Sequence, residues 1–240
     1  MTPKLQTSQD PKKLARQAAY LYLLLIPLGL LGIIYTPEFI LVAGDASATI
    51  ANIANNESMF RLSIISALAV QVAQLFAVFA LYRLLKPAGR KIGLLMVAFI
   101  MVAIPIAMLN ELNHVAALNL VTNPEHFSAF TLEQSNAMIM FALSLHADGV
   151  MIAHIFWGLW LLPMGILVYQ SGFIPRFIGL LLIMGSFGYV ADSLIWFLLP
   201  DVDVLMSQFT FIGELILPLW LLTKGIKTDI WHKKQSNAIT

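Results

Sequence analysis

Residues 81–100 read LYRLLKPAGRKIGLLMVAFI, a short basic turn between two long apolar stretches. The same alternation of apolar stretch and basic connection recurs along the chain. All of the 14 Lys and Arg residues except Arg61 fall in four clusters, which are Lys4/Lys12/Lys13/Arg16, Arg83/Lys86/Arg90/Lys91, Arg176 alone, and Lys224/Lys227/Lys233/Lys234. Positive residues accumulate in the cytoplasmic connections of membrane proteins, so this pattern predicts both a membrane location and an orientation.

The composition excludes a soluble globular protein. Of the 240 residues, 59% are apolar and only 11% are charged, and the mean hydropathy is +0.82. Soluble domains carry roughly 25% charged residues, so too little charge is present to cover a globule of this size. The net charge of +1 hides a strong segregation of the positive residues. The basic clusters suit the anionic cytoplasmic leaflet, so no nucleic-acid partner is needed to explain them. Cysteine is absent, which excludes disulfides, thiolate metal sites and cysteine nucleophiles.

A helix needs about 20 apolar residues to cross the hydrocarbon layer. Six stretches meet this length, at about 18–36, 62–82, 92–113, 146–170, 177–199 and 206–223. An even number places both basic termini on one side, together with the basic loops Leu85–Lys91 and Ser171–Arg176. We therefore expect an all-α polytopic membrane protein, one bundle of six transmembrane helices with both termini cytoplasmic. Residues 1–17 and 224–240 are the expected cytoplasmic tails, and 18–223 the transmembrane domain.

The first apolar stretch resembles a secretory signal only in part. Ala46-Ser47-Ala48 has the A-x-A form of a cleavage site, but the apolar run 18–35 exceeds the 7–15 residues of a signal peptide. We expect an uncleaved spanning helix.

The outer connections also contain helix signals. Residues 47–54 form a weakly amphipathic run that suits a short interfacial helix. Thr131 followed by Gln134 predicts a capping box at the start of a helix that continues into the fourth span. The alternative for both connections is plain loop.

The sequence contains a trace of internal repetition. Residues 90–97 read RKIGLLMV and residues 176–183 read RFIGLLLI, each leaving a basic loop for a spanning helix. Two parallel repeats, as in some transporters, would produce this similarity. Any basic loop before an apolar helix would produce it as well.

Ionisable residues inside the spans are costly in lipid and are therefore candidates for function. Counted at 1.5 Å per residue from the basic ends, Glu214 lies near the middle of its span, and His154 and Asp192 lie further out. The outermost turns hold Glu111, His114, His146 and Asp148. This distribution predicts a polar funnel open to the outside, with the candidate ligand-binding residues Glu111, His114, His154, Asp192 and Glu214.

A metal centre is one use of these residues. Glu111 and His114 are three residues apart and share a helix face, a spacing that also serves metal sites in helical bundles. Together with His154 and Asp192 they form a hypothetical zinc site with N and O ligands. The structural alternative is that His154, Asp192 and Glu214 pair within the bundle, and that His146 and Asp148 lie in the headgroup region. No cofactor is firmly implied.

Three segments resemble a known family: FWGLWLLPMG at 156–165, SGFIPRFIG at 171–179, and LYRLLKP at 81–87. They resemble bacterial multi-pass proteins catalogued as domain of unknown function 4386, over most of the chain. The resemblance implies a helical bundle in the bacterial inner membrane. It supplies no catalytic residues.

Three functions are consistent with the sequence, which contains no Gly-rich phosphate loop, G-x-S-x-G or H-E-x-x-H motif. The first is a non-enzymatic membrane protein whose outward-facing polar cavity binds or passes a small molecule or ion. The second is a metal-dependent intramembrane hydrolase that uses Glu111, His114, His154 and Asp192. The third is a structural or accessory membrane component without a ligand.

Overall fold

The computed structural model describes residues 10–237, and the regular elements within that range are all helices. In chain order they are α1 (Pro11–Gly29), η1 (Leu30–Ile34), η2 (Thr36–Ile40), α2 (Ala46–Asn55), α3 (Glu57–Leu85), α4 (Arg90–Thr122), η3 (Pro124–Phe127), α5 (Leu132–Ser171), α6 (Arg176–Leu198), α7 (Ser207–Thr210), α8 (Ile212–Thr223) and α9 (Thr228–Asn237). Lys4, in the first basic cluster, lies outside the described residues.

Five helical segments are long and apolar enough to cross a membrane: Pro11–Ile40, α3, α4, α5 and α6. The segment Ser207–Thr223 qualifies as a sixth when it is joined to α9, from which it is bent by 103°. The chain is thus consistent with a polytopic membrane protein of five to six spans. With 33 and 40 residues, α4 and α5 are about 50 and 60 Å long. Both exceed the ~30 Å hydrocarbon layer and must project from it.

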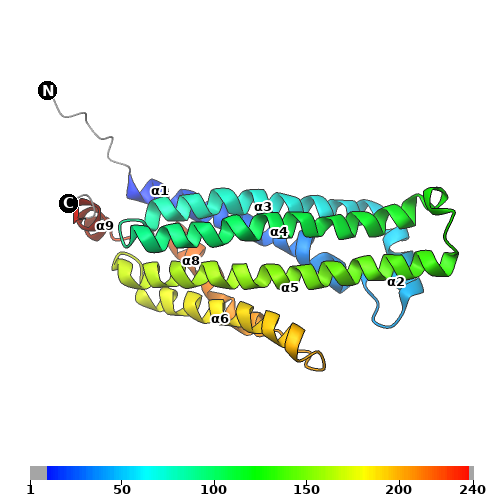
Figure 1. Ribbon diagram of the computed structural model, residues 1–240. Helices are drawn as coiled ribbons and strands as arrows, with labels where there is room; N and C mark the ends of the chain where they lie inside the picture. The colour runs from blue at the N-terminus through cyan, green and yellow to red at the C-terminus, as the bar shows by residue number, and fades with distance from the viewer. Residues whose placement is uncertain (1–9, 238–240) are drawn as a thin grey trace.

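The long helices pack as a ring in chain order. The contacts run α1–α3–α4–α5–α6–α8, and α8 closes the ring against α1. The α3–α4 and α5–α6 turns lie at one end of the bundle, together with the start of α1 and with α9 (Figure 1). We call this the basic end, because these turns and α9 carry many of the Lys and Arg residues. The opposite end, where α4 and α5 reach furthest, is the far end.

Helix α9 lies across both turns of the basic end. The Trp231 indole donates to the Leu84 carbonyl at 2.9 Å, and the Lys234 ammonium donates to the Gln170 carbonyl at 2.7 Å. The Lys227 amide donates to the Phe173 carbonyl at 3.1 Å. The first two bonds satisfy carbonyl groups near the ends of α3 and α5, where the helix itself provides no donor.

The apolar core is divided along the bundle axis. The bundle core contains residues of α4 up to Ala103 and residues of α5 from Trp160 onward. The far core joins Ile40, Ile53, Phe60, Ile64, Ala117, Leu118, Leu120, Ile139, Ala142 and Leu143. Between the two cores, α4 and α5 carry a section where polar side chains are buried.

Two local features hold the ring in register. Helices α5 and α6 approach closely at Gly165 and Gly179, since a Cβ on Gly165 would lie 2.7 Å from the Gly179 carbonyl oxygen. Beyond Pro27, α1 continues into the π-helical segments η1 and η2, and the Ser66 hydroxyl of α3 donates to the Leu28 carbonyl at 2.9 Å. A neighbouring helix thus satisfies backbone groups near the change of helix type.

The helix signals in the outer connections are confirmed. Helix α2 covers the amphipathic run 47–54. Thr131 forms the predicted capping box with Gln134, and α5 continues from there through the bundle without a break. Helix α2 and the start of α5 therefore form part of the far end. The buried polar section lies next to the far core, on the side toward the bundle core.

Candidate functional site

The polar section contains two clusters of side chains. We call Glu111, His114 and His146 the histidine triad. The cavity cluster comprises Gln71, Gln74, His154, Asp192 and Glu214, which line the inside of the ring. All members of both clusters are buried, except that Glu214 is half-buried.

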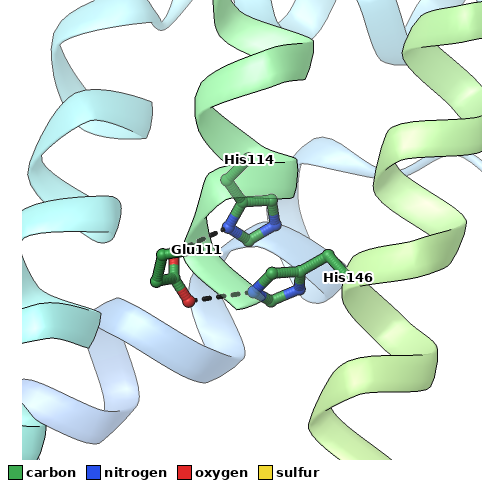
Figure 2. A group of neighbouring side chains, drawn as sticks. All are labelled: Glu111, His114 and His146. Carbon is green, nitrogen blue, oxygen red and sulfur yellow. Dashed lines mark hydrogen bonds and ion pairs between the residues drawn. The ribbon is translucent and has the colours of Figure 1, made fainter. Parts of the chain in front are cut away.

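The histidine triad joins α4 to α5 (Figure 2). Glu111 and His114 lie on one face of α4, and the His114 Nδ1 is 3.1 Å from Glu111 Oε2. The other carboxylate oxygen, Oε1, is 2.9 Å from the Nε2 of His146 on α5. The two imidazole rings are stacked, with their centroids 3.4 Å apart. One carboxylate therefore holds two histidines from adjacent helices.

Neighbouring residues position the triad. The Asn110 amide donates to the His146 carbonyl at 2.8 Å, which fixes α5 against α4 at this level. The Phe60 ring packs edge-on against His114, with the centroids 5.2 Å apart. Gly149 allows the approach of Asn110, because a Cβ there would overlap the Asn110 side chain. The triad is thus held by packing as well as by its own hydrogen bonds.

The position of His146 corrects a sequence expectation. The structural alternative left this residue among headgroups or water, but its side chain is buried inside the protein and only 6% exposed. The capping signal at Thr131 predicted a long helix without showing what covers its projecting part. In the structure α5 begins at Leu132, and this part packs in the far core with residues of α2, α3 and α4. Sequence reasoning therefore left out this member of the triad, since no local pattern pairs His146 with Glu111.

A large cavity of about 1160 Å³ lies inside the ring. Its walls come from α1, η1, η2, α3, α5, α6, α7 and α8, from His114 of α4, and from the loop between α6 and α7. The exposed lining residues Glu38, Pro200 and Asp203 mark its rim on the far side. Apolar side chains such as Leu25 and Met151 alternate with the polar members of the cavity cluster. The cavity is therefore amphipathic, and the cavity cluster is its buried polar part.

Several polar atoms of the cavity lining have no hydrogen-bond partner. Within residues 10–237, the buried side-chain atoms in this condition are Gln71 Oε1, His154 Nδ1, Trp157 Nε1 and Glu214 Oε1. All four residues line the large cavity. The His154 Nδ1 is 3.8 Å from Asp192 Oδ2, which is too long for a hydrogen bond. Buried polar groups are ordinarily paired, so four unpaired atoms around one cavity indicate a missing partner.

Asp192 and Glu214 both have structural contacts as well. The Asp192 carboxylate accepts hydrogen bonds from the backbone amides of Met206 and Ser207, which ties α6 to the start of α7. Glu214 Oε2 accepts a hydrogen bond from the Tyr22 hydroxyl at 2.8 Å, which joins α8 to α1 where the ring closes. Of these two acids, Glu214 keeps an unpaired oxygen, so it is the better placed to meet a ligand.

The structure divides the residues that the metal hypothesis grouped together. Glu111 and His114 lie with His146, whereas His154 lies near Asp192. His146 and His154 are eight residues apart on the unbroken α5, or about 12 Å along its axis. Among the described residues, the His, Asp and Glu group that brings three ligand atoms within 4.8 Å of one another is Glu111, His114 and His146. Metal binding at either position stays a prediction.

Comparison with known proteins identifies the family. Residues 18–225 match the family described as Domain of unknown function (DUF4386), and the chain therefore belongs to it. A protein of Archaeoglobus fulgidus, named only "Uncharacterized protein", is 38% identical over 76 residues, which are 32% of this chain. The chain spans about half, 46%, of the length of that archaeal relative. No solved structure matches the chain.

Proposed function

We propose that this member of the DUF4386 family is a non-enzymatic membrane protein that binds a small amphipathic molecule in the cavity inside its helix ring. One observation carries the proposal: the four unpaired buried polar atoms all belong to residues that line this cavity. Each unpaired group costs roughly 1–3 kcal/mol when it is removed from water without a partner. A ligand with matching donors and acceptors recovers that free energy.

The size and lining of the cavity support an organic ligand over a bare ion. Ligand pockets measure about 300–1,000 Å³ and are mostly apolar with a few placed polar groups. The present cavity, at about 1160 Å³, is slightly larger than this range. Its apolar walls suit a hydrocarbon part. Gln71 and His154 offer an acceptor and a ring nitrogen to a polar group.

The orientation follows from the positive charges. In this proposal the basic end faces the cytoplasm, residues 1–17 and 224–240 are cytoplasmic tails, and the cavity opens to the outside. We further propose the cytoplasmic membrane of a bacterium as the location. A reporter that fluoresces only in the cytoplasm, fused after Thr240, is expected to fluoresce. A periplasmic phosphatase reporter at the same position is expected to stay inactive, and the reverse pattern contradicts the orientation.

Access to the cavity can be measured with single cysteines, because the chain contains none of its own. Gln71→Cys places a thiol in the cavity lining. Val78→Cys on the same helix is the matched control, since Val78 is fully buried in the bundle core and away from the cavity. A charged, membrane-impermeant methanethiosulfonate added from outside is expected to label the first variant and to spare the second. A protected Gln71→Cys contradicts an open cavity and favours the ligand-free structural component.

Ligand binding itself is tested by extraction. Protein purified into lipid nanodiscs is extracted with organic solvent, and mass spectrometry compares the small molecules recovered. Ala147→Phe fills the cavity, whereas Leu145→Phe adds bulk on the exposed face of the same helix. A compound that is retained by wild type and by Leu145→Phe but lost by Ala147→Phe supports the proposal. Equal recovery from all three proteins counts against it.

A metal-dependent intramembrane hydrolase is the second candidate. One observation favours it: His114 and His146 line the same cavity. Hydrolysis of a chromogenic acyl ester by zinc-supplemented protein, abolished by a chelator, is the result that this function requires. Equal rates of hydrolysis before and after chelation contradict a metal-dependent hydrolase.

A further inference from the structure

We infer that Glu111, His114 and His146 form a binding site for a divalent transition metal of the zinc class, with an open coordination position toward the cavity. The inference goes beyond the proposed binding of an organic molecule and does not depend on it. It rests on the geometry of the histidine triad, on the charge of Glu111 and on the place of the triad in the cavity wall.

The three ligand atoms have the spacing that a small metal ion requires. They lie within 4.8 Å of one another, and the carboxylate oxygens are 2.9 and 3.1 Å from the two imidazole nitrogens. Zinc binds nitrogen and oxygen at about 2.0–2.2 Å, which sets neighbouring ligands of a tetrahedron roughly 3.3 Å apart. To bind one ion, the two stacked rings must turn so that both nitrogen lone pairs point at it, and their hydrogen bonds to Glu111 are then exchanged for bonds to the ion. Imidazole with carboxylate is a donor set that suits zinc more than magnesium or calcium.

The charge of the site favours a cation. Glu111 is 6% exposed, and within residues 10–237 the ion-pair partners recorded for its carboxylate are His114 and His146. The one basic residue away from the clusters, Arg61, pairs with Glu57 instead. An acidic group buried in the bundle is costly without a positive partner. A divalent ion held between the carboxylate and two imidazoles supplies that positive charge.

Neighbouring residues bring the three ligand residues together before any ion binds. Asn110 fixes the backbone of His146 against α4, and Phe60 supports the ring of His114. The stacking of the two rings at 3.4 Å aligns both of them beside the same carboxylate. Ligands held in this way by surrounding residues lose little freedom on binding, which raises affinity.

The triad provides three protein ligands, and zinc sites with three protein ligands keep a fourth position for water or another molecule. His114 and His146 line the large cavity, whereas Glu111 lines only the small adjoining one. The ion therefore lies in the wall, with protein behind Glu111 and the cavity in front of the histidines. A small anion that enters the cavity is able to reach the open position.

The test uses the full chain with an affinity tag that contains no histidine. Wild-type protein is stripped with a chelator, incubated with one equivalent of zinc and freed of excess metal, and its zinc is counted by mass spectrometry. We expect about one zinc per chain. His146→Gln is expected to bind at least tenfold less zinc, because an amide cannot replace the imidazole as a metal ligand. The Gln amide can still donate to Glu111, so the contact between α4 and α5 is kept. His126→Gln, at an exposed histidine of η3 outside both clusters, is the control and is expected to retain the ion.

Cobalt(II) provides a second readout that needs no variant. Wild-type protein loaded with cobalt is expected to show the visible absorption of a site with low coordination number, and azide is expected to shift those bands by entering the open position. Folding of each variant is checked by size-exclusion chromatography and circular dichroism. Absence of zinc from folded wild type, or equal zinc in His146→Gln and wild type, overturns the metal site. Cobalt bands that azide leaves unchanged overturn the open position.

Discussion

The histidine triad and the cavity cluster are similarly buried, yet they differ in how completely their polar groups are paired. Both carboxylate oxygens of Glu111 have an imidazole partner. In the cavity cluster, Gln71, His154 and Glu214 each keep an unpaired atom. Burial alone therefore does not show where an organic ligand would form hydrogen bonds, whereas unpaired buried atoms do.

The difference has a cause in the packing. The triad lies where α4 and α5 are direct neighbours in the ring, so that its side chains reach one another. The cavity cluster lies around the inside of the ring on α3, α5, α6 and α8, whose side chains face a space of about 1160 Å³. Groups on opposite walls of such a space cannot meet without a ligand or water between them.

The largest effect is expected from Glu111→Leu. This change leaves two buried imidazoles without their shared acceptor, and each buried polar group that loses its partner costs about 1–3 kcal/mol. Chemical unfolding in detergent, followed by circular dichroism, measures the loss. Leu112→Ala, at an exposed neighbouring position, is the control and should change stability far less. A Glu111→Leu protein as stable as wild type would contradict the structural importance of the triad.

A smaller loss is expected from Gly149→Ala. The added Cβ would lie 2.8 Å from Asn110 Nδ2, so Asn110 must move away from the His146 carbonyl. Overpacking of this kind costs about 1–3 kcal/mol. The same substitution at Gly29 has nothing within 4 Å and should stabilise α1 by about 0.5–1 kcal/mol. The unfolding temperatures of the two variants should therefore shift in opposite directions. A shift in the same direction would contradict the close contact between Gly149 and Asn110.

Asp192→Asn is expected to lower the free energy of unfolding by about 1–2 kcal/mol, because hydrogen bonds to charged groups are stronger than hydrogen bonds between neutral groups. The Asp192 carboxylate accepts from two backbone amides at the start of α7. Asp148→Asn, whose acid bonds Trp196 at an exposed position, is the comparison and should lose less. Thermal unfolding in detergent compares the two. Equal losses would show that Asp192 contributes nothing beyond a surface contact.

The smallest effect, with the opposite sign, is expected from Gln71→Leu. Replacing an unpaired acceptor with an apolar group should stabilise the ligand-free protein by about 1 kcal/mol, since no hydrogen bond of that oxygen is lost. Val72→Leu, on the exposed face of α3, is the control. The same Gln71→Leu protein should retain less of any extracted cavity ligand. A marked loss of stability would instead show that Gln71 acts structurally, as Glu111 does.

Much of the fold follows from local sequence. Apolar length predicts the spans, and the chain has five to six long apolar helices. Thr131 and Gln134 predict the start of α5 because a capping box acts within one turn. Local sequence predicts less of the candidate site, because its residues come from different helices. The pairing of Glu111 with His114 follows from a spacing of three residues on one helix, but His146 joins them from another helix.

The sequence by itself determined a helical membrane bundle, because helix length and hydropathy act along the chain and need no knowledge of neighbours. The tertiary structure alone decided which polar residues meet. Helix α5 runs for 40 residues, so its projecting part buries His146 beside Glu111, while His154 comes to face the cavity. Contacts between helices depend on how the helices pack and how the ring closes, and packing involves residues from the whole molecule.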